Sequence, residues 1–119
     1  MSYSTPVPIL RIFDVDKAKE FYVDFLGFDV EFSHRFDDGF PLYMGLRAGD
    51  CVLHLSEHHG DCSPGAQIRI VVDDIEALQK SLTGKVYKFA RPEIQEMPWK
   101  TKDMMVTDPF GNRVTFTTG

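Results

Sequence analysis

The chain has 119 residues, 43% of them hydrophobic and 26% charged. A chain of this length folds as one domain, and its hydrophobic content excludes a disordered protein. The formal net charge of −5 argues against nucleic-acid binding as the main role and is compatible with a cationic ligand. No apolar run reaches the ~20 residues of a membrane span. Residues 1–6 carry no signal-peptide pattern, so we expect no membrane partner, a cytoplasmic location, and Cys51 and Cys62 as reduced thiols.

The first half of the chain predicts one strand, one helix and three further strands. Residues 7–13 are rich in β-branched and aromatic residues, and Pro8 confines this strand to the edge of a sheet or to the start of the strand. Asp14 is placed to cap a helix whose apolar positions recur every three or four residues as far as Gly27. The further strands are expected at residues 28–36, 42–47 and 51–56. The alternation in the first of them predicts one apolar face made of Phe28, Val30 and Phe32.

The second half of the chain begins in the same way. Residues 67–72 predict a strand, and Asp74 caps a helix that ends near Gly84, before an irregular stretch through Pro92. Strands follow around residues 93–97, 100–107 and 113–117. We therefore predict a single-domain α+β fold of two βαβββ modules, with module one at 5–57, a linker at 58–65 and module two at 66–119. The alternative is a chance pair of strand–helix units in an unrelated α+β domain.

Short motifs at the ends of the helices and in the strands and turns add to this pattern. A helix ends in Leu26-Gly27-Phe28, and a second one starts at Asp73-Asp74-Ile75. Shorter segments follow in the strands and turns: Leu53-His54-Leu55-Ser56, Met97-Pro98-Trp99 and Asp108-Pro109-Phe110-Gly111-Asn112. Together with the first strand, these motifs resemble the glyoxalase/bleomycin-resistance/dioxygenase superfamily, also called the vicinal oxygen chelate proteins. The resemblance covers nearly the whole chain and is greatest to the bleomycin-resistance branch.

The resemblance implies a fold in which two curved sheets face each other around a cleft, and a homodimer with ligand sites near the subunit interface. It also implies where family enzymes would bind a divalent metal, namely at Val7, His54, Gln67 and Thr115. Valine offers no donor atom, and glutamine and threonine are weak ones. Only His54 is a strong ligand, so we expect a binding protein with no metal and no cofactor rather than an enzyme.

The alternation within each strand predicts which side chains face the cleft. His54 is opposite the more apolar set of its strand, and Gln67 and Arg69 are opposite the apolar set of theirs. By the resemblance, flat ligand rings stack on aromatic residues that different subunits supply, here Trp99 with Phe36, Phe40 and Tyr43. Nearby acidic residues, among them Asp38 and Asp103, would attract a cation. Each of these aromatic residues could instead fill the core or a dimer interface.

These residues lead to one preferred hypothesis and two alternatives. The preferred one is a protein that sequesters a flat, cationic, metal-chelating antibiotic or similar compound in a cleft at a dimer interface. The first alternative is a metal-dependent lyase or dioxygenase of the same superfamily that uses His54. The second is a protein that binds another metabolite, since one fold supports many functions.

Overall fold

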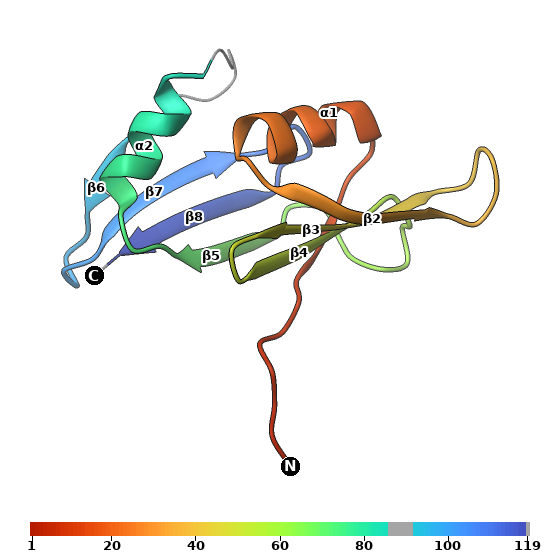
Figure 1. Cartoon of the computed structure of the whole chain (residues 1–119), viewed down its shortest axis with the longest axis horizontal. Coiled ribbons are helices and arrows are strands. Elements are labelled where there is room, and N and C mark those ends of the chain that lie inside the picture. The colour runs from red at the N-terminus through yellow and green to blue at the C-terminus, as the bar shows by residue number, and fades with distance from the viewer. Residues whose placement is uncertain (86–91, 119) are drawn as a thin grey trace.

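The computed structural model describes residues 1–85 and 92–118 (Figure 1). Module one contains, in order, β1 (Ile9–Arg11), α1 (Val15–Lys19), the π-helical η1 (Glu20–Phe25), β2 (Asp29–Arg35), β3 (Leu42–Ala48) and β4 (Cys51–Ser56). Module two contains β5 (Gln67–Val71), α2 (Ile75–Thr83), β6 (Ile94–Glu96), β7 (Lys102–Thr107) and β8 (Arg113–Thr118). The predicted α+β fold of two βαβββ modules is confirmed. The irregular stretch expected before Pro92 lies mainly outside the described residues. Within the described ranges, no helix has the length and apolar character needed to cross a membrane.

Each module forms its own four-stranded mixed sheet. The strand order is β1-β4-β3-β2 in sheet one and β5-β8-β7-β6 in sheet two. In both sheets the first strand of the module pairs in parallel with the last, and the other pairs are antiparallel. β1 lies at a sheet edge and Pro8 directly precedes its first residue, so both places predicted for the proline are found. The Pro8 carbonyl accepts a hydrogen bond from the His54 amide.

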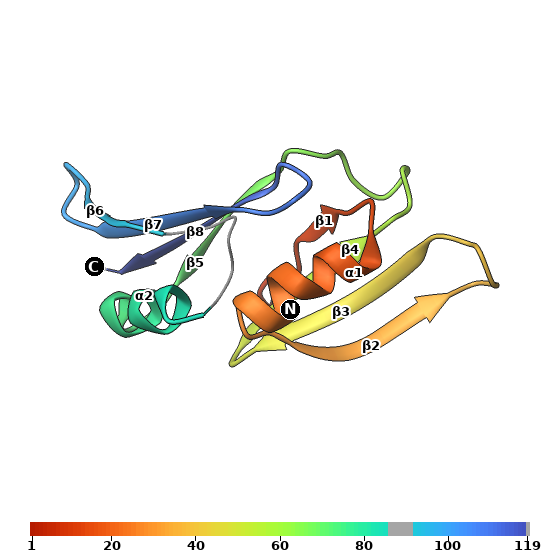
Figure 2. The ribbon, with the colours of Figure 1, turned by 90° about the horizontal axis from the view of Figure 1, so that it is seen from above.

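The two helices begin where the aspartates predicted them to begin. Asp14 accepts a hydrogen bond from the Lys17 amide at 2.9 Å, and Asp74 accepts one from the Ala77 amide at 3.0 Å. The first helix differs from the prediction, because η1 continues α1 with wider π turns in place of a single α-helix. The views in Figures 1 and 2 agree that α1 lies over sheet one and α2 over sheet two.

Side-chain alternation gives each sheet a buried face under its helix and an open face opposite. Leu10 of β1 and Ile12 just after it are buried, whereas Ile9 of β1 is partly exposed. One hydrophobic cluster contains buried side chains of both modules, from Phe21 of η1 to Phe116 of β8. The two modules therefore share one core and leave their open faces to solvent.

The turn between β7 and β8 joins the modules through buried hydrogen bonds. Tyr22 donates from its hydroxyl to Asp108 Oδ2 at 2.6 Å. Asn112 Nδ2 donates to the Arg11 carbonyl and to Asp108 Oδ2, both at 2.8 Å, and Asn112 Oδ1 accepts from the Ala66 amide at 3.1 Å. Tyr22 and Arg11 belong to module one and the other residues to module two, so these bonds fix one half of the chain against the other.

The network leaves the buried Asp108 carboxylate fully hydrogen-bonded. Its Oδ1 also accepts from the amides of Phe110 and Asn112, each at 2.8 Å. Burial, followed by the charge and the hydrogen bond of Asp108, raises the pKa of the Tyr22 hydroxyl far above its ordinary value. Tyr22 therefore stays protonated and keeps its role as a donor.

We predict that Tyr22→Phe lowers the free energy of unfolding by about 1.5–3 kcal/mol, because it removes a hydrogen bond to a buried charged group. Urea unfolding at neutral pH would measure the loss. Tyr3→Phe is the control, since Tyr3 is 90% exposed and its variant should unfold like the wild type.

The raised pKa of Tyr22 makes the stability of the protein depend on pH in the alkaline range. Stability that Tyr22 contributes is present below the unfolded-state tyrosine pKa of about 10 and is lost as pH rises above it. This alkaline loss should be smaller in Tyr22→Phe than in the wild type. Equal alkaline losses in the two proteins would contradict the assigned role of the hydroxyl.

Candidate ligand-binding cleft

A cavity of about 480 Å³ lies on the open face of sheet two, at the end of the molecule that carries β6. The predicted site residues Gln67, Trp99 and Asp103 all line it. Gln67 comes from β5, Asp103 from β7 and Trp99 from the turn between β6 and β7. The other lining side chains are Arg69, Pro92, Glu93, Gln95, Met97, Met105 and Thr115. The cavity thus combines apolar walls with a few polar groups, as ligand pockets do.

Asp103 forms the polar floor of this cavity and is only 8% exposed. Its Oδ1 accepts from the Thr117 hydroxyl at 2.6 Å and from the Thr101 hydroxyl at 3.1 Å. Arg69 Nη2 lies 3.1 Å from Asp103 Oδ2. The Thr117 hydrogen bond, with those of Thr101 and Arg69, lowers the pKa of the Asp103 carboxyl below its ordinary value despite burial. Asp103 is therefore ionised and already engaged by its neighbours.

Trp99 occupies the rim of the cavity in a tight turn. The Lys100 amide donates to the Met97 carbonyl at 2.9 Å, and the Met97 amide donates to the Thr101 carbonyl at 2.8 Å. Lys100 has a φ of 71°, in the left-handed region that residues with a side chain disfavour. The indole is 60% exposed and lines the cavity. The turn therefore holds Lys100, next to the single tryptophan, in a strained backbone conformation.

The open face of sheet one carries a second group of site residues. The Tyr43 hydroxyl lies 2.7 Å from His54 Nδ1. The ring of Phe32 stacks on Tyr43 with centroids 6.2 Å apart and meets His54 edge-on at 5.3 Å. Burial, followed by the negative charge of Asp61, raises the pKa of the Tyr43 hydroxyl. Tyr43 and His54, both predicted, are thus brought together on β3 and β4.

Phe32 is a site residue that the sequence did not predict. The expected alternation placed Val30 and Phe32 on one face, and this is wrong, because a bulge shifts the register of β2 between them. Val30 pairs with Leu46 and Phe32 with Gly45, adjacent residues whose strand positions face opposite sides. Gly45 itself was the available signal, since a glycine inside a strand marks a close approach. A Cβ at this position would overlap the Phe32 ring.

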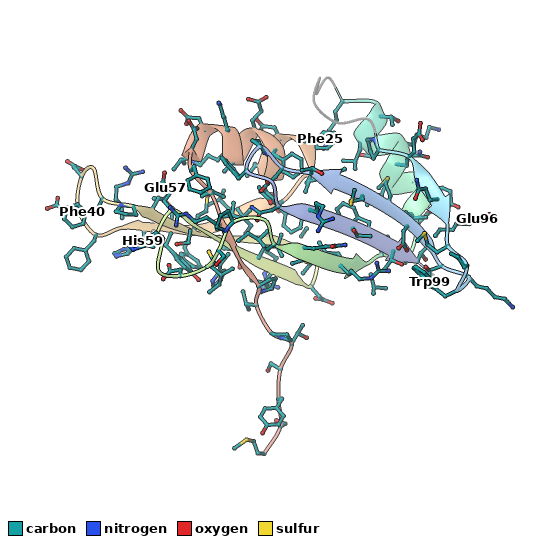
Figure 3. All side chains as sticks on the ribbon, turned by 180° about the vertical axis from the view of Figure 1, so that it is seen from behind. Phe25, Phe40, Glu57, His59, Glu96 and Trp99 are labelled. Carbon is teal, nitrogen blue, oxygen red and sulfur yellow. The ribbon has the colours of Figure 1, made fainter. Side chains whose placement is uncertain are left out.

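Phe36 and Phe40 extend this group along the turn between β2 and β3. Their rings stack with centroids 6.1 Å apart, and they are 81% and 50% exposed. Asp38 lies between them in the exposed turn. Figure 3 shows Phe40 and Trp99 at opposite ends of the molecule. A single chain therefore does not bring the two predicted aromatic regions together.

The four positions implied for a metal also divide between the modules. His54 contacts Tyr43 in module one, whereas Gln67 and Thr115 line the cavity of module two. Val7 belongs to the segment before β1. Among the described residues, no group of three or more histidines, cysteines or acidic residues is placed to hold a metal ion.

Comparison with known proteins identifies the family. The whole chain, residues 1–119, matches the family described as glyoxalase superfamily protein. The chain therefore belongs to the glyoxalase superfamily, and the resemblance seen in the sequence is confirmed. No curated protein sequence matches it at a significant level.

Solved structures place the chain beside the bleomycin-binding proteins. It is 30% identical to the bleomycin-binding protein from bleomycin-producing Streptomyces verticillus, solved with copper(II)-bleomycin, with a TM-score of 0.75 over 100% of this chain and 98% of that chain. The bleomycin resistance determinant of transposon Tn5 is 19% identical, with a TM-score of 0.73 and 98% of both chains covered. Lactoylglutathione lyase from Agrobacterium tumefaciens is 15% identical, with a TM-score of 0.76 over 100% of this chain and 96% of that chain. The last two show the fold alone, and that fold serves a binding protein and an enzyme alike.

We predict that Gly45→Ala moves the Phe32 ring away from His54 and Tyr43 without unfolding the protein. The ring is 43% exposed, so it can swing outward at small cost. Proton NMR would show the change as a loss of ring-current shifts on the His54 and Tyr43 side chains. Gly60→Ala is the matched control, because a Cβ there meets nothing within 4 Å. Unchanged shifts in Gly45→Ala would contradict the packing described.

We predict that Lys100→Gly raises the free energy of unfolding by about 0.5–1 kcal/mol, because glycine adopts the left-handed conformation without strain. Thermal or urea unfolding would measure it. Lys100→Ala keeps a Cβ and should give no gain. A destabilised Lys100→Gly would show that the turn is not strained.

Proposed function

We propose that this protein binds a flat, cationic small molecule in a cleft formed between two copies of the chain. The observation that carries the proposal is the 30% identity, over the whole length, to a bleomycin-binding protein solved with copper(II)-bleomycin. Bleomycin, or a compound of the same chemical class, is the proposed ligand. The proposed mode of action is sequestration, with no bond made or broken.

The distribution of aromatic residues supports a site between two copies. Phe40, whose ring stacks on Phe36, lies at one end of the molecule and Trp99 at the other. If module one of one copy covers the open face of module two of its partner, both groups contribute to the same cleft. Each dimer then has two equivalent sites, as twofold symmetry requires.

The open faces also carry apolar side chains that a second copy would cover. Ile9 is 36% exposed, Phe32 43%, Met105 49% and Val71 82%. Large exposed apolar patches on a soluble protein mark interaction surfaces. The N-terminal end of the segment before β1 extends away from the body of the molecule, and this segment includes the 90% exposed Tyr3 (Figure 1). A homodimer is therefore the assembly we propose.

Within such a cleft the side chains would make three kinds of contact with the ligand. The Trp99 indole and the Phe36–Phe40 pair offer flat surfaces, and stacking contributes ~0.5–1.5 kcal/mol per ring pair beyond burial. Asp38 and Glu93 are exposed carboxylates that would attract a positive charge. Tyr43 and His54 would supply hydrogen bonds to the polar parts of the ligand.

We predict that copper-loaded bleomycin binds saturably at micromolar concentration, with one ligand per chain, when followed by isothermal titration calorimetry. Trp99→Ala should weaken the binding by roughly 2- to 13-fold, the loss of one stacked ring. Phe13→Leu is the control, since Phe13 packs on Phe110 and does not line the module-two cavity, so its variant should bind normally. Metal-free bleomycin, titrated in parallel, shows whether the metal contributes. No saturable heat with either form would contradict the bleomycin proposal.

We predict that sedimentation equilibrium gives twice the mass of the 13.6 kDa chain at micromolar concentration. Met105→Glu, which adds a charge to the open face of sheet two, should shift the protein towards the monomer because burying an unpaired charge is costly. The control is Glu93→Gln, which leaves the apolar surface intact. A wild type that stays monomeric would rule out the shared cleft.

A further inference from the structure

Arg69 is a charged side chain that lines the module-two cavity and to which the proposed function assigns no role. It lies on β5, and its register partner on β8 is Thr115. Asp103 lies one strand further, on β7, so the Arg69 side chain reaches across β8 to meet it. The side chain is nevertheless 47% exposed. Arg69 therefore lines the cavity, is held in place by one partner and keeps about half of its side chain exposed.

Only part of the guanidinium group is used by this ion pair. Its Nη2 is the atom that contacts Asp103, at 3.4 Å from Oδ1 and 3.1 Å from Oδ2. Over residues 1–85 and 92–118, Nε and Nη1 of Arg69 have no hydrogen-bond partner. A guanidinium has five N–H donors in a rigid planar arrangement that matches the two oxygens of a carboxylate. The free edge of Arg69 is thus an oriented pair of donors.

The neighbouring carboxylate does not offer a competing site for a cation. Asp103 already accepts from Thr117, Thr101 and Arg69, and it is almost fully buried. Besides the exposed Glu93, the cavity therefore presents to a ligand the donor edge of Arg69 and the amide of Gln67, which also lines it. The guanidinium can only donate and therefore selects a hydrogen-bond acceptor, and the NH2 group of Gln67 can supply a further donor to it.

We propose that Arg69 is a specificity-determining residue that receives a planar oxygen acceptor, above all a carboxylate attached to a flat ring. Asp103 is its positioning residue, because it fixes the guanidinium without blocking Nε and Nη1. The ring itself would lie against Trp99 and the methionine side chains Met97 and Met105. This proposal rests on the proposed ligand site and deepens it: the ligand carries an acidic or carbonyl group at its module-two end besides any cationic group elsewhere.

A matched pair of flat probes tests the proposal, namely 2-naphthoate and 2-naphthylmethylammonium, which share a ring system and differ in charge. Binding to the full-length protein is followed by the NMR shift of the Trp99 indole N–H. The wild type should bind 2-naphthoate at least ~10-fold more tightly, the scale of a charge-assisted hydrogen bond. Arg69→Gln should lose this preference. Arg69→Lys, which keeps the charge but not the planar fork, should lose most of it.

Lys102→Gln is the matched control. It removes one positive charge from the same module, but from the other face of β7, where Lys102 pairs with Glu76 on α2. It should keep the preference of the wild type. If Lys102→Gln lost as much of the preference for 2-naphthoate as Arg69→Gln, the preference would depend only on net charge. That result would overturn the proposal.

The outcomes also separate this proposal from the proposed function. Binding of 2-naphthoate that depends on Arg69 supports the role of Arg69 whether or not bleomycin binds. Bleomycin binding without any preference for 2-naphthoate overturns the role of Arg69 and leaves the proposed function intact. Absence of binding by bleomycin and by both probes overturns both.

Discussion

The buried hydrogen bonds of Asp108 and Asn112 are the constraint on which the rest of this structure depends. Over residues 1–85 and 92–118, one continuous helical segment covers the sheet of each module, α1 with η1 in module one and α2 in module two. A half of about 60 residues buries too little apolar surface to be secure alone. The turn between β7 and β8 brings an amide and a carboxylate to the Arg11 carbonyl and the Tyr22 hydroxyl of the other module. Unpaired, these groups would be costly to bury. Their pairing therefore specifies a single arrangement of the modules and, through it, the relative placement of the two open faces.

Much of this fold follows from local patterns in the sequence. Asp14 and Asp74 mark the starts of the helices, Pro8 predicts an edge strand, and the Asp-Pro-x-Gly-Asn segment predicts the last turn. Local patterns do not reveal a β-bulge, which reverses the face that the following side chains of a strand occupy. The bulge in β2 moves Phe32 to the open face of sheet one. The π-helical turns of η1 cannot be told from α-helical turns by the spacing of apolar residues in the sequence.

For the candidate site, the sequence predicted which face of a strand a side chain occupies but not which side chains meet. Alternation correctly places His54, Gln67 and Arg69 opposite the buried faces of their strands, and the structure groups Trp99, Gln67 and Asp103 around one cavity. Contacts among site residues depend on register across strands, as for Tyr43 with His54 and Arg69 with Asp103. A composition rich in acidic residues points to a cationic ligand, whereas the cavity itself offers a guanidinium. Net charge describes the whole surface, and a binding site depends on which charges remain unpaired.

A complementation experiment tests the central claim, a ligand site shared between two copies, most directly. Trp99→Ala damages the module-two half of every site, and Phe40→Ala damages the module-one half. In mixed dimers of the two variants, one site combines the intact halves of both chains and the other combines both damaged halves. Titration of the mixture with copper-loaded bleomycin should therefore recover a fraction of sites with wild-type affinity, although neither variant alone has any. A mixture that binds no better than the separate variants would contradict a site built from two copies.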